Sequence, residues 1–196
     1  MIIIFLIILI HFLLVTLIYF QLKNHDNNKI TGMELVTKIL GENNNFYIVL
    51  SNTFVTNYYD VNKKTIKLSK NVYSGTSFYS LMIASFIAHS AKSNNKNMKF
   101  LNSNFNFINY FICFSYLSLI VVILLGSINV YITIILLFII LIVIEMVTYN
   151  EKKLIIDKVI KDIGNFYTIE NKNVFLVNYT YYINCVFFKI LSYVKL

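Results

Sequence analysis

Long apolar runs alternate with polar segments along this chain of 196 residues. The apolar runs cover residues 1–20, about 107–125, about 130–147 and about 174–194. Each approaches the roughly 20 apolar residues that a helix needs to cross a bilayer. The pattern predicts a multi-pass α-helical membrane protein, in which the short turn at residues 126–129 joins the second and third runs into a hairpin.

The polar segment between the first two runs predicts a small α+β domain. Thr31 and Glu34 have the spacing of a capping box, so a helix is expected to begin there and to end at Gly41. Residues 78–91 form an apolar segment that is too short to span a bilayer, which predicts a buried helix. Aromatic and β-branched residues predict strands at residues 46–50, 54–59 and 65–69, with a turn at residues 60–63.

These elements divide the chain into five predicted segments. They are an N-terminal membrane anchor at residues 1–22, the α+β domain at 23–106, a transmembrane hairpin at 107–148, a charged amphipathic helix at 149–173 and a membrane or interfacial helix at 174–196. In the charged segment, polar residues share a helical period with an apolar stripe, as on a helix with one solvated face.

Composition and charge agree with a membrane protein. Hydrophobic residues make up 58% of the chain, and its formal net charge is +8, with all 17 basic residues being lysines. Lysines concentrate at residues 21–106 and 149–173, so the positive-inside rule predicts an integral membrane protein whose α+β domain faces the cytoplasm. Nucleic acid is not an expected partner, because the lysines are scattered. Cys113 and Cys185 lie in apolar runs and predict neither a disulfide nor a zinc site.

Five short motifs follow one another along the chain. They are T-G-M-E at residues 31–34, V-T-N-Y-Y-D at 55–60, K-T-I-K-L-S at 64–69, V-Y-S-G-T-S at 72–77 and Y-T-Y-Y at 179–182. Their order and spacing resemble the YugP-like family of bacterial neutral zinc metallopeptidases. The resemblance implies a zincin-like α+β domain between membrane helices, and a zinc cofactor. It also implies a catalytic H-E-x-x-H helix, in which two histidines hold the metal and the glutamate activates its bound water.

The zinc-binding positions that this resemblance implies are filled by other residues. Counting on without a gap from the V-Y-x-G-x-S motif, the first histidine falls on Phe86, the glutamate on Ile87 and the second histidine on Ser90. His89 is present, but the residues four before and four after it are serines, so the helix contains no H-E-x-x-H motif.

A third zinc ligand is implied near the end of the third apolar run. Glu145 matches this position, and a different gap places Thr148 there instead. Catalytic zinc needs about three protein ligands and a water, and neither Phe86 nor Ile87 offers a ligand atom or a base. We therefore expect no catalytic residue, no metal site and no bound cofactor, and we interpret the chain as a catalytically inactive pseudopeptidase.

Two alternatives stay open. An active metallopeptidase could draw relocated ligands from His25, Asp60, His89, Glu145 and Glu151. A membrane scaffold or assembly subunit would instead use aromatic-rich helices for packing. Under each hypothesis the lipid bilayer is an expected partner, and a membrane protein, or a peptide held in the old cleft, is a further one.

Overall fold

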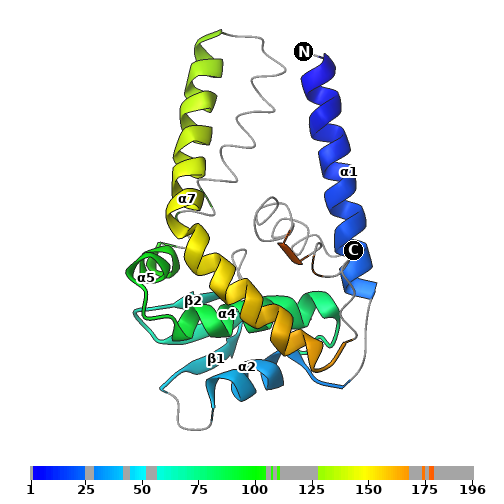
Figure 1. Cartoon of the computed structure of the whole chain (residues 1–196), viewed down its shortest axis with the longest axis vertical. Helices are drawn as coiled ribbons and strands as arrows, with labels where there is room; N and C mark the ends of the chain where they lie inside the picture. The colour runs from blue at the N-terminus through cyan, green and yellow to red at the C-terminus, as the bar shows by residue number, and fades with distance from the viewer. Residues whose placement is uncertain are drawn as a thin grey trace.

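The computed structural model describes residues 2–24, 29–41, 45–51, 57–104, 107, 110, 128–167, 174 and 177–178. Its helices are α1 (Ile2–Asn24), α2 (Gly32–Leu40), α3 (Lys70–Tyr73), α4 (Phe78–Lys92), α5 (Lys96–Ser103) and α7 (Ile128–Gly164). Its strands are β1 (Tyr47–Leu50), β2 (Tyr58–Asp60) and β3 (Thr65–Leu68). In Figure 1, α1 and the first half of α7 extend away from a domain that the other elements form.

The three strands form one sheet in the order β1-β3-β2. β2 and β3 are antiparallel, with Tyr58 opposite Lys67, and the turn at residues 61–64 connects them. β1 runs parallel to β3, with Tyr47 beside Thr65. Consequently β1 and β2 are the two edge strands of the described sheet, and the face that carries Ile66 and Leu68 is buried beneath the helices.

The predicted capping box begins α2. Thr31 N–H donates to Glu34 Oε2 at 2.8 Å, and Glu34 N–H donates to Thr31 Oγ1 at 3.3 Å. Gly41 ends the helix with a φ of 85°, in the region that favours glycine. The helix predicted between Thr31 and Gly41 is therefore confirmed.

Acid should weaken this capping box. Hydrogen bonds from the Thr31 backbone and side chain hold the pKa of Glu34 below its ordinary value. Because the folded-state pKa is the lower one, the stabilisation is complete above the unfolded-state pKa, about 4.3, and is lost as the pH falls through the folded-state value. We expect the Tm, measured by circular dichroism, to decrease between about pH 5 and pH 3 by more in the wild type than in Glu34→Gln. The control variant Thr37→Ala should show the same decrease in Tm as the wild type. Equal decreases in the wild type and in Glu34→Gln would contradict this prediction.

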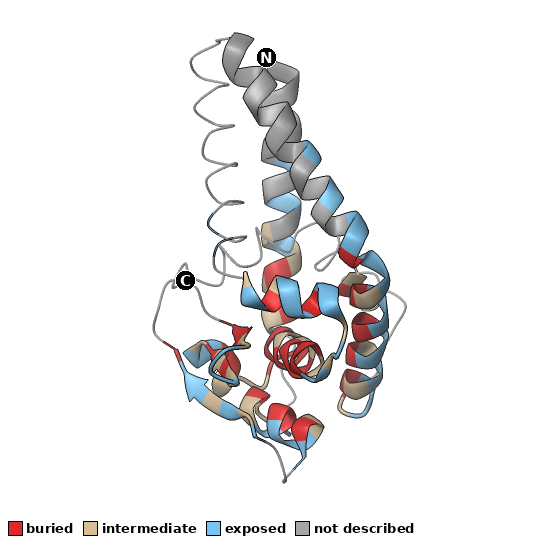
Figure 2. Ribbon diagram, turned by 90° about the vertical axis from the view of Figure 1, so that its left-hand side faces the viewer, coloured by how far each residue is buried: buried red, intermediate tan, exposed pale blue. Residues whose placement is uncertain are grey.

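Helix α4 lies at the centre of the domain. Eleven of its fifteen residues are buried, and Figure 2 shows it almost end-on and almost entirely red. One side contacts a first core, to which α1, α2, α5 and α7 contribute side chains such as Leu35 and Ile156. The other side contacts a second core, built from the sheet, α2 and α3 around Ile66 and Val72. A helix that is apolar on most sides is expected in such a position.

The prediction of a multi-pass membrane protein is wrong. Within the residues that the structure describes, no helix is both long enough and apolar enough to cross a membrane. The same finding overturns the integral-membrane localisation and, with it, the cytoplasmic orientation of the domain. The part of the predicted fold class that the structure supports is the small α+β domain.

Part of the apolar surface that suggested membrane spans packs inside this domain. Tyr19 and Leu22, near the end of α1, are buried in the first core together with Ile155 and Val159 of α7. Apolar periodicity alone does not distinguish a helix that packs on protein from one that packs on lipid. α7 continues unbroken for 37 residues, so the third apolar run and the charged segment after it belong to one helix. Most of the second and fourth runs lies outside the described residues.

Candidate functional site

Small polar residues fix the start of α4. Ser77 is its N-cap, and Ser77 Oγ accepts a hydrogen bond from Ser80 N–H at 3.2 Å. Ser80 Oγ donates to the Asn71 carbonyl at 2.9 Å and lies 2.9 Å from Ser77 Oγ, from which it accepts. The Tyr167 hydroxyl donates to the Thr76 carbonyl at 2.7 Å. The V-Y-S-G-T-S motif therefore positions the helix on which the resemblance places the zinc ligands.

Two glycines bring this motif into contact with the T-G-M-E motif. Gly32 N–H donates to the Gly75 carbonyl at 3.0 Å. A Cβ added to Gly32 would lie 2.0 Å from the Val72 carbonyl oxygen, and one added to Gly75 would lie 2.0 Å from the Asn71 carbonyl oxygen. Any side chain at either position would overlap backbone atoms. Gly32 thus allows α2 to approach α3 closely, and Gly75 allows the tight connection between α3 and α4.

The first two implied zinc-site positions lie in apolar packing. Phe86 is partly buried against the first core. Ile87 is 5% exposed and belongs to the second core. Neither side chain has a lone pair for a metal or a group that can accept a proton from water, so these positions contribute packing to the fold.

Ser90, at the position implied for the second histidine, is hydrogen-bonded to a residue of α5. Ser90 Oγ donates to Asn102 Oδ1 at 2.9 Å, and Asn102 Nδ2 donates back to the Ser90 carbonyl at 3.3 Å. Both side chains are buried. One amide therefore satisfies the hydroxyl of Ser90 and ties α4 to α5.

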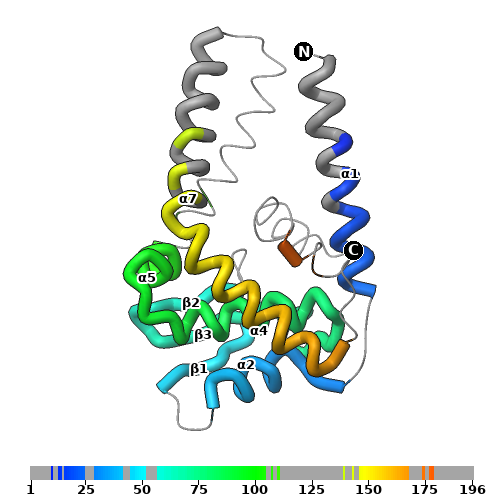
Figure 3. Tube along the Cα trace, viewed as in Figure 1, coloured from blue at the N-terminus to red at the C-terminus, as the bar shows by residue number. Residues whose placement is uncertain are grey.

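His89 points to α7, where it shares a carboxylate with Ser85. His89 Nε2 lies 2.7 Å from Asp162 Oδ2, and Ser85 Oγ donates to the same oxygen at 2.8 Å. The side chains of His89 and Asp162 are 16% and 25% exposed, whereas Ser85 is fully buried. Figure 3 shows the last part of α7 crossing α4, the two helices to which these three residues belong. The cluster joins two helices that are more than 70 residues apart in sequence.

The candidates for the third ligand lie on α7. Thr148 is buried, with 2% of its surface exposed. Glu145 lies on the same helix, but its side chain falls outside the described residues. Glu151, one turn further on, accepts a hydrogen bond from Asn95 Nδ2 at 2.7 Å. The choice between Glu145 and Thr148 therefore stays open.

A zinc ion does not fit the donors found at the implied positions. Among the described side chains, no three His, Cys, Asp or Glu residues gather as a metal-binding group. The described members of the relocated set, Asp60, His89 and Glu151, are therefore not brought together. His25 lies outside the described residues. His89 with Asp162 supplies two donors, fewer than the three or so that catalytic zinc requires. The expectation of no metal and no cofactor stays a prediction.

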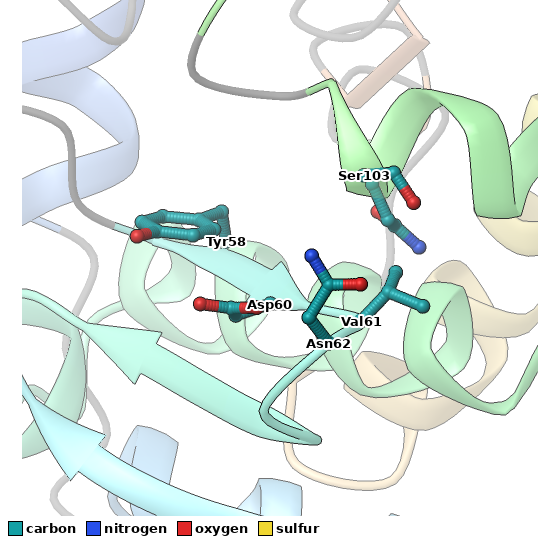
Figure 4. Close-up of a pocket in the computed structure, with 6 residues that line it drawn as sticks. Tyr58, Asp60, Val61, Asn62 and Ser103 are labelled. Carbon is teal, nitrogen blue, oxygen red and sulfur yellow. The ribbon is translucent and has the colours of Figure 1, made fainter.

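A polar hollow of about 180 Å³ lies between β2 and α5. Its lining residues are Tyr58, Asp60, Val61, Asn62, Asn102 and Ser103. Figure 4 shows the residues of β2 and the following turn along one wall and Ser103 opposite them. Because Asn102 also binds Ser90, this hollow lies next to the position where the resemblance implies the second histidine.

Lys67 sets the charge on the β2 side of the hollow. Lys67 Nζ donates to the Tyr58 hydroxyl at 2.7 Å and lies 3.7 Å from Asp60 Oδ2. The hydrogen bond to Tyr58, with help from Asp60, raises the pKa of Lys67. Burial, with help from the Asp60 charge, raises the pKa of the neighbouring Tyr59. Lys67 therefore balances the carboxylate of Asp60, and the other polar side chains that line the hollow are neutral.

Sequence reasoning did not single out Ser85, Asn102, Ser103 and Asp162. Ser85 and His89 are four residues apart and so share a helix face, which is the one local signal that could have linked them. Asp162 lay in a mixed-charge run that was interpreted as a solvated face. Its role depends on the packing of α7 on α4. Because the residues in contact are more than 70 positions apart, no local sequence pattern indicates that contact.

Comparison with known families agrees with the motifs. The family model described as "Putative neutral zinc metallopeptidase" matches residues 1–150, about three quarters of the chain. The chain therefore belongs to this neutral zinc metallopeptidase family, and the resemblance to it is confirmed. No curated protein and no solved structure matches the chain.

Proposed function

We propose that this chain is a non-catalytic member of its family that holds an extended peptide beside β2 without cutting it. The observation that carries the loss of catalysis is the occupation of the three implied zinc-site positions by Phe86, Ile87 and Ser90. The first two pack into apolar cores, and the third is bound by Asn102. A hydrolytic mechanism would require a metal-bound water and a base, which these side chains do not supply.

Two features support peptide binding. β2 is an edge strand of the sheet within the described residues, and an edge strand presents backbone N–H and C=O groups that can pair with an extended chain. The hollow beside it is lined by amide and hydroxyl groups from Asn62, Asn102 and Ser103, which can both donate and accept hydrogen bonds. Neutral groups of this kind suit the backbone of a peptide better than they suit an ion.

The test is whether the full chain binds peptides without cleaving them. The purified protein is equilibrated with zinc, freed of excess metal and analysed by mass spectrometry, and we expect less than about 0.1 zinc per chain because both histidine ligands of the H-E-x-x-H motif are missing. Fluorescence anisotropy with labelled casein peptides should show binding, while the peptides stay intact with and without a chelator. Ser103→Trp should abolish the binding by filling the hollow, and Thr37→Trp, on the exposed face of α2, should leave it unchanged.

The competing hypotheses predict other outcomes. Stoichiometric zinc together with chelator-sensitive hydrolysis that His89→Ala removes would support relocated ligands. Absence of peptide binding, with a folded protein by circular dichroism, would leave the scaffold hypothesis and contradict the proposed one.

A further inference from the structure

The junction of α5 and α7 carries an apolar surface that the domain leaves exposed. Asn97 Nδ2 donates to the Val147 carbonyl at 3.3 Å, which holds the two helices together at this point. Phe100, almost one turn further along α5, is 60% exposed. Met146 and Val147 on α7 are 73% and 57% exposed. Large apolar side chains that gather on a surface mark a site of interaction more often than single ones do.

Lysines surround this apolar surface. Leu154, 56% exposed, lies seven residues after Val147 and so on the same face of α7, two turns further on. We define the α5–α7 patch as the apolar residues Phe100, Met146, Val147 and Leu154 together with the lysines Lys96, Lys99, Lys153 and Lys158, all of them exposed. Figure 1 shows α5 beside the middle of α7, where the patch lies.

The positive charge of the patch is not neutralised within the described part of the chain. None of its four ammonium groups has an ion-pair or hydrogen-bond partner there. Glu151, the carboxylate at the helix junction, is bound by the Asn95 amide. That amide is neutral, so Glu151 and the exposed Asp157 both count as carboxylates on this part of α7, and the four lysines outnumber them by two. The chain as a whole carries a formal charge of +8.

We propose that the α5–α7 patch docks an acidic amphipathic segment of a partner protein. Apolar side chains of that segment would cover Phe100, Val147 and Leu154, and its flanking carboxylates would pair with the lysines. A nucleic acid is the less suitable occupant, because clustered arginines usually bind phosphate and this chain contains no arginine. This surface is separate from the hollow beside β2, so the inference goes beyond the proposed peptide binding.

The probe is a fluorescein-labelled helical peptide of leucine and glutamate, about 18 residues or five turns long, with leucine on one face. Its binding to the full chain is measured by anisotropy. Phe100→Ser should weaken binding about tenfold, as expected for an aromatic anchor at the centre of an interface. Lys96→Gln with Lys99→Gln should weaken it about fivefold, and added salt should remove most of that difference. Lys63→Gln with Lys64→Gln, the same charge change at the turn after β2, should have less than about a twofold effect.

The same experiment can overturn the proposal. A matched peptide with glutamine in place of glutamate should bind much more weakly, and equal binding would show that charge complementarity plays no part. Equal loss in the two double lysine variants would show that net charge alone matters. Phosphatidylglycerol vesicles are the third probe: if they bind in a manner that depends on Lys96 and Lys99, and the leucine–glutamate peptide does not bind, the occupant is a lipid surface and the proposal is wrong.

Discussion

Replacing Gly32 with alanine is expected to destabilise the fold by about 3 kcal/mol, the largest single effect that the structure indicates. The new Cβ would lie 2.0 Å from the Val72 carbonyl oxygen and 3.3 Å from the Ala84 Cβ. Because the first of these contacts is with backbone, relief requires α2 to move away from α3, which would also lengthen the hydrogen bond from Gly32 to Gly75. Urea denaturation followed by circular dichroism measures the change.

Helix propensity makes this prediction sharp. Gly32 is the first residue of α2, where alanine is no worse a helix former than glycine, so a net loss of stability identifies the steric overlap as its cause. Thr37→Ala, at an exposed position of the same helix, should change the free energy of unfolding by less than about 0.5 kcal/mol. A Gly32→Ala variant as stable as the wild type would show that α2 and α3 are not packed as described.

Asp162→Ala is expected to cost about 2 kcal/mol of stability, although Asp162 is partly exposed. The substitution removes the acceptor that Ser85 and His89 share. The Ser85 hydroxyl is fully buried, and a buried hydroxyl without an acceptor carries its full desolvation penalty. Thermal and urea unfolding of the full chain measure the loss.

Two further variants separate this cause from others. Asp162→Asn keeps one oxygen as acceptor and should lose less than half as much stability as Asp162→Ala. Asp157→Ala, exposed on the same helix, should lie within about 0.5 kcal/mol of the wild type. Equal losses for Asp162→Ala and Asp157→Ala would mean that the loss comes from the negative charge of α7 and not from the bond to Ser85.

Features encoded over a few residues could be predicted from the sequence. The capping box of α2 depends on two residues three positions apart, and both bonds are present. Alternation in the β3 segment and the apolar run of α4 gave those elements to within about one residue at each end. The hairpin between β2 and β3 follows from two strand-forming segments with a short polar turn between them.

Features that depend on distant segments could not be predicted in the same way. The parallel pairing of β1 with β3 has no local signal, because β2 lies between them in the sequence. The contact between Asp162 and Ser85 spans 77 residues. Residues 1–22 are predicted as a membrane anchor from their apolar content, which does not reveal that Tyr19 is buried in the first core together with side chains of α4.

The close contact between Gly32 and Val72 has a consequence for how other sequences of this family are read. Both residues belong to short motifs on which the resemblance to the metallopeptidases rests, and here they meet each other where α2 packs on α3. The packing of the fold is therefore a sufficient reason for both motifs to be present, whether or not the chain catalyses hydrolysis. The presence of these motifs in a sequence indicates the fold. Whether such a sequence encodes an enzyme depends on which residues it has at the positions equivalent to 86, 87 and 90.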